Sequence, residues 1–236
     1  MFNKSRNLNR FLVVGLCTII MFVISCAGSR SGSAGNQVSD ELASDTNNKK
    51  VEVEAYLFDA KFRKKGKPTS FRLELFQSDS VIGMFGRGYV GKGILKGTLS
   101  RDSLALYFPT SGEYFIESTG KVLTELPCQI NAPSLDIFDL FSTLPDSIVL
   151  DSAVVVISDY SNRKKPEFSL SVPGCEWEIN LKYDFRKGGW RLLKFEYQGG
   201  DNTSLKATRR EFRNRVRVKP NRLQVNIPES AVRIVR

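Results

Sequence analysis

From Val51 onward the chain alternates between apolar and polar residues and is rich in β-branched and aromatic side chains. Strict alternation places every second side chain on one face of a strand, so the pattern predicts half-buried strands. Turn sequences such as those at residues 65–68 and 187–189 separate them, and a spacing of about 8–12 residues favours an antiparallel sandwich or barrel. We expect strands at residues 51–62, 70–77, 81–91, 93–99, 103–108, 113–117, 153–158, 167–172, 175–184, 189–198, 204–218, 222–227 and 231–235.

Glycines crowd the stretch from Gly83 to Gly97. Glycine inside a strand typically marks a bulge or a sharp bend, which a strongly curved sheet needs. The alternative is a glycine-rich phosphate loop, but no Gly-Lys-Ser and no helix start follow. The sequence therefore predicts a mainly β domain over residues 51–236, built on a strongly curved antiparallel sheet.

One segment has the period of a helix instead, at residues 133–144. Leu135, Phe138 and Phe141 recur at intervals of three, which places them on one face of a helix. A proline at the start of the segment suits a first helical turn, and Pro145 ends the element. We expect a short amphipathic helix that covers the concave side of the sheet.

Residues 1–25 are typical of an export signal. The first ten carry three basic residues and no acid, and residues 11–24 are an uninterrupted apolar stretch. This stretch is too short to span a bilayer comfortably, because a transmembrane helix needs about 20 apolar residues. The sequence that ends at Cys26, Val-Ile-Ser-Cys, resembles the lipobox of bacterial lipoproteins, which implies lipidation of Cys26. The alternative is an uncleaved anchor with an incidental cysteine.

Residues 26–50 follow as a segment rich in Ser, Gly, Ala and Asn. Such a composition predicts a flexible tether with a reach of roughly 25 Å. In the proteobacterial sorting pattern an aspartate directly after the lipidated cysteine favours retention at the inner membrane. Ala27 stands there instead, so we expect the outer membrane, with the domain facing the periplasm.

Two cysteines remain after Cys17 leaves with the signal and Cys26 takes the lipid: Cys128 and Cys175. An exported chain enters an oxidising compartment, so a Cys128–Cys175 disulfide is expected. Two separate thiols are the alternative.

The chain contains no histidine, which excludes a Ser-His-Asp triad, a Cys-His dyad and a histidine metal site. Carboxylate pairs occur at Glu52/Glu54 and Glu176/Glu178, and each pair lies on one face of its strand. A solvated strand face explains such pairs better than an acid–base dyad. We therefore expect no enzyme, no metal site and no cofactor.

The formal net charge is +10, and the excess of basic over acidic residues lies in the C-terminal segment. Alternation predicts that Arg213, Arg215, Arg217 and Lys219 share one face of a strand. Anionic lipid headgroups or lipopolysaccharide phosphates are the polyanions open to an exported protein, whereas nucleic acid is not expected as a partner. The alternative is an edge strand whose charges block aggregation.

Three stretches, together with the anchor and the tether, resemble the LolA/LolB superfamily, in particular its uncharacterised LolB-like lipoproteins. The stretches are Ser70–Gly88, Asp102–Phe115 and Gly189–Val235. Proteins of this family are incomplete β-barrels whose open side is covered by helices and whose apolar cavity holds acyl chains. The resemblance implies an incomplete barrel over residues 51–236, with the helix at 133–144 over its concave side.

The walls of such a cavity follow from the alternation of two strands and from the helix. The expected residues are Phe71, Leu73 and Leu75 on one strand, Leu104, Leu106 and Phe108 on another, and Leu135, Phe138 and Phe141 on the helix.

Two functions remain open. One is a membrane-anchored protein that binds an acyl chain, a lipid or a lipoprotein, in lipid or lipoprotein sorting. The other is a structural or assembly lipoprotein that binds a protein partner through its exposed sheet. A continuous cavity favours the first and a filled barrel the second.

Overall fold

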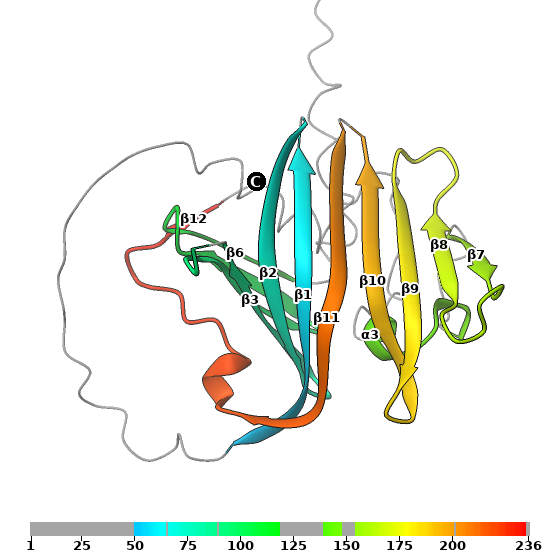
Figure 1. Ribbon diagram of the computed structural model, residues 1–236. Coiled ribbons are helices and arrows are strands. Elements are labelled where there is room, and N and C mark those ends of the chain that lie inside the picture. Colours follow the sequence, from blue (N-terminus) through cyan, green and yellow to red (C-terminus); the bar gives the residue numbers. More distant parts are fainter. Residues whose placement is uncertain are drawn as a thin grey trace, which may run out of the picture.

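The computed structural model describes residues 50–118, 139–147 and 154–234, except Lys65, Tyr89 and Asp201. The strands in these ranges form one 12-stranded sheet that does not close into a barrel (Figure 1). They are β1 (Val51–Lys64), β2 (Lys67–Gln77), β3 (Val81–Arg87), β4 (Gly93–Ser100), β5 (Ser103–Phe108), β6 (Glu113–Ser118), β7 (Val155–Asp159), β8 (Glu167–Ser171), β9 (Glu178–Arg186), β10 (Gly189–Gly199), β11 (Thr203–Val218) and β12 (Val232–Arg233). The expected fold class, mainly β with a curved and incompletely closed sheet, is confirmed.

The first strand lies in the middle of the sheet. β1 pairs with β2 on one side and with β11 on the other, so that two antiparallel meanders meet there. β2 to β6 follow one another outward from β1, and β7 to β11 run inward from the opposite edge. β12 is added in parallel beside β6. The segment between β6 and β7 therefore connects the two sides of the sheet.

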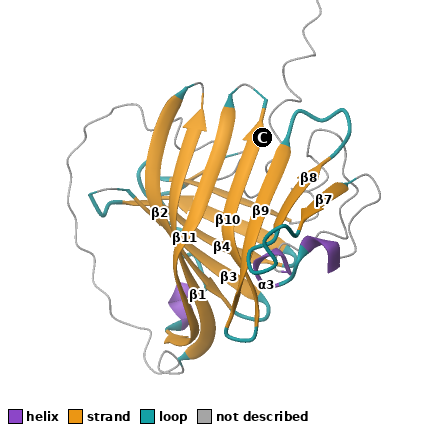
Figure 2. Cartoon of the chain, turned by 45° about the vertical axis from the view of Figure 1, so that its right-hand side comes forward, coloured by secondary structure: helices purple, strands orange, loops and turns teal. Residues whose placement is uncertain are grey.

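The sheet folds back on itself, and Figure 2 shows β3 and β4 passing behind β10. The inward side chains of both meanders join in one hydrophobic cluster. On β1, for example, Tyr56, Phe58, Ala60 and Phe62 are buried, whereas Asp59 between them is exposed. The alternation read from the sequence thus places the core on the concave side.

The helix expected over residues 133–144 is one turn long in the described chain, α3 (Asp139–Ser142). Pro145 begins a separate 3-10 turn, η1 (Pro145–Ser147), because proline cannot continue the helix. The expected N-terminal half, residues 133–138, lies outside the described residues. In the part of the chain that the structure describes, no helix is long and apolar enough to cross a bilayer.

A strand was expected at residues 222–227, and this prediction is wrong. After β11 the chain makes a 3-10 turn, η2 (Pro220–Arg222), and then crosses the outer face of the sheet. The Thr98 hydroxyl on β4 donates to Leu223 O (3.1 Å) and accepts from Val225 N (2.7 Å). A side chain therefore satisfies backbone groups that strand pairing would otherwise satisfy.

This crossing segment, residues 219–231, is termed the C-terminal strap, and it is the orange-red segment at the left of Figure 1. The strap lies directly on the backbone of Gly83 in β3. A Cβ at this position would come within 1.9 Å of Arg222 O, so only glycine admits the strap at this distance. Part of the glycine-rich stretch thus serves a close approach of two backbones.

Candidate functional site

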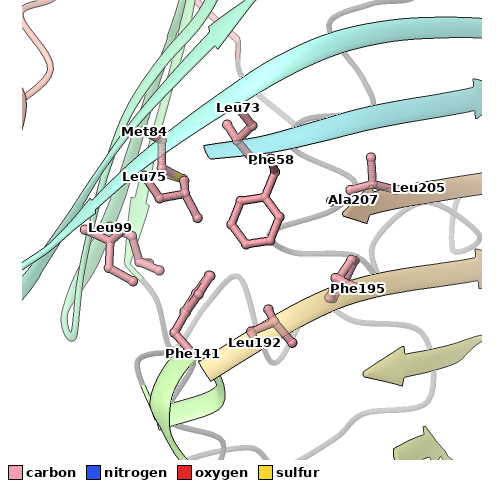
Figure 3. Close-up of a pocket in the computed structure, with 11 residues that line it drawn as sticks. Phe58, Leu73, Leu75, Met84, Leu99, Phe141, Leu192, Phe195, Leu205 and Ala207 are labelled. Atoms are coloured by element: carbon pink, nitrogen blue, oxygen red, sulfur yellow. The ribbon is translucent and has the colours of Figure 1, made fainter. Parts of the chain in front are cut away.

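An apolar cavity of about 60 Å³ lies between the two meanders (Figure 3). Its lining side chains in the described chain are all hydrophobic. They are Phe58 on β1, Leu73 and Leu75 on β2, Ile82 and Met84 on β3, Leu99 on β4, Phe141 on α3, Leu192 and Phe195 on β10, and Leu205 and Ala207 on β11. Strands of both meanders and the single helical turn therefore build one wall.

α3 holds Phe141 against the cavity. The Tyr183 hydroxyl on β9 donates to Leu140 O at 2.8 Å, which ties the helical turn to the inner face of the sheet. The Phe141 ring lies 5.8 Å from the ring of Tyr56, and Figure 3 shows it beside Leu192. α3 therefore covers part of the concave side, as expected for this segment.

The size of the cavity determines what it can hold in this conformation. Its volume of about 60 Å³ leaves room for only a few atoms. The void is smaller than the roughly 150 Å³ that accepts a benzene-sized guest, and its lining offers water no hydrogen-bond partner. An acyl chain would therefore enter only together with a movement of the surrounding side chains.

β10 and β11 part next to the cavity. They pair from Lys194↔Thr208 to Gly199↔Thr203, whereas residues 189–192 of β10 pair with β9 and have no register partner on β11. β11 continues along β1, and Figure 1 shows β10 and β11 diverging toward α3. This divergence is termed the split.

Arg209 of β11 bridges the split. Its guanidinium donates to Leu192 O at 2.9 Å and to Asp184 Oδ1 on β9 at 2.6 Å. The Arg209 and Asp184 side chains are only 5% and 7% exposed, and Arg186 donates to the second Asp184 oxygen at 2.9 Å. Burial raises the pKa of Asp184, but the hydrogen bonds from Arg209 and Arg186 outweigh it and hold this pKa below its ordinary value.

Arg191 makes a second bridge, from β10 to β1. Its guanidinium lies 2.5 Å from Glu54 Oε1, and Tyr56 donates to Glu54 Oε2 at 2.7 Å. Burial and the hydrogen bond to Glu54 raise the pKa of Tyr56, so its hydroxyl remains a donor. The guanidinium carbons of Arg191 and Arg209 lie 5.5 Å and 5.7 Å from the ring centre of Phe212. The residues at the split are termed the bridge cluster: Glu54, Asp184, Arg186, Arg191, Arg209 and Phe212.

The cavity residues expected from the sequence all face the core where they are described, but only some reach the cavity. Those that line it are Leu73, Leu75 and Phe141. Those that are buried in the same hydrophobic cluster away from its lining are Phe71, Leu104, Leu106 and Phe108. Leu135 and Phe138 lie outside the described residues.

A β-bulge divides the basic residues of β11. Between the partners of Val53 and Ala55, β11 carries one residue more than β1, and Arg215 has a φ of 55°. One extra residue reverses the alternation of side chains. Arg213 and Arg217 therefore point to opposite faces of the sheet. The prediction that the four basic residues share one face of the strand is wrong.

The four basic residues Arg213, Arg215, Arg217 and Lys219 are all exposed. Two of them have acidic neighbours: Arg213 lies 2.5 Å from Glu211, and Arg215 lies 3.6 Å from Glu52. These contacts are solvated and weak, so all four side chains remain accessible to an external anion.

The cysteines and carboxylate pairs are only partly described. Cys175 is disulfide-bonded, but Cys128 lies outside the described residues, so their pairing stays a prediction. Cys26 lies outside them as well. Glu178 accepts a hydrogen bond from Ser169 at 2.7 Å, and no three Cys, Asp or Glu side chains of the described chain gather as a metal site requires.

Most of the cavity wall and the whole bridge cluster were not predicted from the sequence. One signal was present: Leu205, Ala207 and Arg209 recur at a spacing of two on β11, which places Arg209 on the face of the cavity residues. No sequence pattern indicates its partner Asp184, because the contact between Arg209 and Asp184 forms only where the pairing of β10 and β11 ends.

No family model and no curated protein matches this chain. Similar solved structures include an uncharacterized conserved protein from Thermus thermophilus, with 10% identity, a TM-score of 0.39, and coverage of 77% of this chain and 90% of that one. An outer membrane lipoprotein-sorting protein domain from Vibrio parahaemolyticus has 8% identity, a TM-score of 0.35, and coverage of 69% and 85%. A DUF1329 family protein from Desulfovibrio piger has 8% identity, a TM-score of 0.38, and coverage of 75% and 91%.

The neighbours thus include a domain of the lipoprotein-sorting kind, to which the sequence also bears a resemblance.

Proposed function

We propose that this chain is a lipid-anchored, non-enzymatic protein of the bacterial cell envelope that binds an acyl chain, a lipid or a lipoprotein in its half-barrel. The observation that carries the proposal is the cavity with a purely hydrophobic lining beside α3. Contact with an acyl chain is apolar and non-directional, so a wall of aliphatic and aromatic side chains suits it.

The anchor in this proposal is the lipidated Cys26, which follows a signal peptide at residues 1–25. Residues 26–50 tether the domain to the outer membrane, on its periplasmic side. Val51 pairs with Val218, so the tether joins the sheet at the end where β11 finishes. The exposed basic residues at that end, Arg213, Arg215, Arg217 and Lys219, are thereby brought toward anionic headgroups.

Filling the cavity tests the proposal. Ala207 lines the cavity, and Ala207→Leu adds an isopropyl group there. Binding of the neutral apolar dye N-phenylnaphthylamine is measured by fluorescence, on the chain from residue 26 carrying Cys26→Ser. This chain contains every strand and helix of Figure 1. Wild-type protein is expected to bind the dye, and Ala207→Leu to weaken binding at least about tenfold, because the added group occupies the ligand's space.

Two controls separate binding from folding. Ala105→Leu makes the same change on β5 away from the cavity lining and is expected to leave dye binding unchanged. Ala207→Leu is expected to unfold within about 1.5 kcal/mol of wild type, because filling the void offsets part of the overpacking. Ala207→Val is the milder variant if the larger one does not fold. A wild-type chain that binds no dye would contradict the proposal.

A second candidate is the assembly lipoprotein that binds a protein partner through its exposed sheet. The observation in its favour is the edge strand β7, whose Val155 and Ile157 side chains are 41% and 62% exposed. Exposed apolar side chains on an edge strand favour pairing with another chain. Failure of dye binding, together with a partner cross-linked at Ile157, would support this candidate.

A further inference from the structure

We propose that the split between β10 and β11 is the entrance to the cavity, and that the bridge cluster binds the carboxylate of a fatty acid there. This inference rests on the proposed function, because it supplies the head of a ligand whose chain occupies the cavity. Four observations carry it: the end of strand pairing, the contact of the cluster with the cavity wall, its unbalanced charge and a buried donor without a partner.

The sheet has no backbone hydrogen bonds across the split in the described chain. β10 and β11 stop pairing at Lys194↔Thr208, and beyond that point a side chain connects them, since the Arg209 guanidinium donates to Leu192 O. Side chains can rotate away without breaking a strand ladder. The split is therefore a place where the wall of the half-barrel can part while the strand ladders stay intact.

The bridge cluster lies directly on the cavity wall. The Leu192 side chain lines the cavity, while its carbonyl oxygen accepts the hydrogen bond from Arg209. Phe58, another lining residue, is the register partner of Arg209 on β1. A ligand head held at these guanidinium groups would place its next atoms at the cavity.

The charges of the cluster leave room for a monoanion. Three guanidinium groups, from Arg186, Arg191 and Arg209, face two carboxylates, from Glu54 and Asp184. The Arg191 Nε is buried and has no hydrogen-bond partner among the described residues. A buried donor without an acceptor is unfavourable, and an incoming oxygen would satisfy it.

A carboxylate fits these donors better than a dianionic phosphate. The excess of the cluster is a single positive charge, which one carboxylate balances. The guanidinium fork presents parallel N–H groups at the spacing of carboxylate oxygens. Glu54 contacts Arg191 through one oxygen only, 2.5 Å from Nη2, which leaves the second N–H of the fork open, and Glu54 is the group that a ligand carboxylate would displace.

A matched pair of ligands tests the inference. Dodecanoate and dodecanol carry chains of equal length and differ in the charged head. Binding is measured by calorimetric titration below the critical micelle concentration. The protein is the chain from residue 26 with Cys26→Ser, which contains every strand and helix of Figure 1. Wild-type protein is expected to bind dodecanoate about tenfold or more tightly than dodecanol, because charge-assisted hydrogen bonds form only with the acid.

Variants locate that preference. Arg191→Gln is expected to abolish the preference for dodecanoate, because it removes the guanidinium that receives the carboxylate. Glu54→Gln removes the competing carboxylate and is expected to raise the affinity for dodecanoate several-fold, a gain that misfolding cannot produce. Arg72→Gln, on the exposed face of β2, is the matched control and is expected to change neither affinity. Melting curves verify that each variant is folded.

The outcomes separate the inference from the function on which it rests. Equal binding of the acid and the alcohol would overturn the carboxylate site and leave the proposed function standing. A preference for the acid that persists in Arg191→Gln, with no gain in Glu54→Gln, would also overturn the site. Binding of neither ligand would contradict the proposed function itself.

Discussion

Replacing Gly83 by alanine is expected to destabilise the protein, although nothing in the local backbone requires glycine. Gly83 does not have a positive φ. Where the native conformation suits alanine, Gly→Ala typically stabilises a protein by about 0.4–1 kcal/mol, because it restricts the unfolded chain. The expected effect therefore has the opposite sign to the intrinsic one, and its cause is the C-terminal strap.

The added methyl carbon meets atoms that cannot rotate away. It would lie 1.9 Å from Arg222 O and 2.9 Å from both Arg222 C and Leu223 Cα. The strap would have to lift, which exposes the buried Leu223 side chain and breaks the hydrogen bonds of Thr98 with Leu223 O and Val225 N. Burial of a leucine contributes about 1.5–3 kcal/mol and each hydrogen bond about 1 kcal/mol, so a partial lift costs roughly 2–4 kcal/mol.

Urea unfolding measures this cost, and trypsin tests its location. The lifted strap is expected to make the peptide bond after Arg222 cleavable at a protease concentration that leaves wild-type protein intact. Gly88→Ala is the matched control, because its Cβ would meet its nearest neighbours at 3.8 Å, an ordinary contact. A Gly83→Ala protein as stable as wild type, or more stable, would refute the reasoning.

Three further predictions concern charge, lipid and thiols. Because the pKa of Asp184 is lowered in the folded chain, the stability it provides is complete above the ordinary aspartate value of 3.8 and is lost as the pH falls through the folded pKa. Wild-type stability in urea should thus fall more steeply below about pH 4 than that of Asp184→Asn, and parallel curves would contradict this. Cys26→Ser is expected to abolish labelling by a fatty-acid analogue and to release the protein from the membrane fraction. A Cys128–Cys175 disulfide should appear as one linked peptide in a non-reducing digest, and its reduction should cost about 4 kcal/mol of stability, because the bond restricts the unfolded chain.

The strands were largely predictable from the sequence, because each depends on a local period of two. β5 has the expected bounds, Ser103–Phe108, and β1 was expected to end at Phe62, near its observed end at Lys64. Alternation is a property of the chain itself, so no knowledge of neighbouring strands was needed. The same argument identified the inward residues of β2 and β5.

Register was not predictable, and the errors at β11 follow from it. The strand contains two irregularities opposite β1, one between Val53 and Ala55 and one between Leu57 and Phe58. Each inserts a residue and reverses the alternation, and the irregularity opposite Val53 and Ala55 is the one that separates Arg213 from Arg217. The position of a bulge depends on how the strand pairs with its neighbour, so it cannot be predicted from the alternation of residues along one strand alone.

The topology explains why α3 covers the cavity while the arginines of β10 and β11 close the split beside it. The sheet is continuous through β1 and β11, so the segment from β6 must reach β7 at the opposite edge, and α3 lies within it. α3 contributes Phe141 to the cavity but takes part in no strand pair, so substitutions there can change the size of the cavity without breaking the sheet. At the split the closing contacts come from Arg209 and Arg191, which belong to paired strands and are buried against carboxylates. Removal of Arg209 would leave Asp184 buried beside the exposed Arg186 alone, a costly state. We therefore expect substitutions in α3 to change the size of the ligand that the cavity accepts while the protein stays folded. Substitutions of Arg209 are expected to lower the stability of the fold itself.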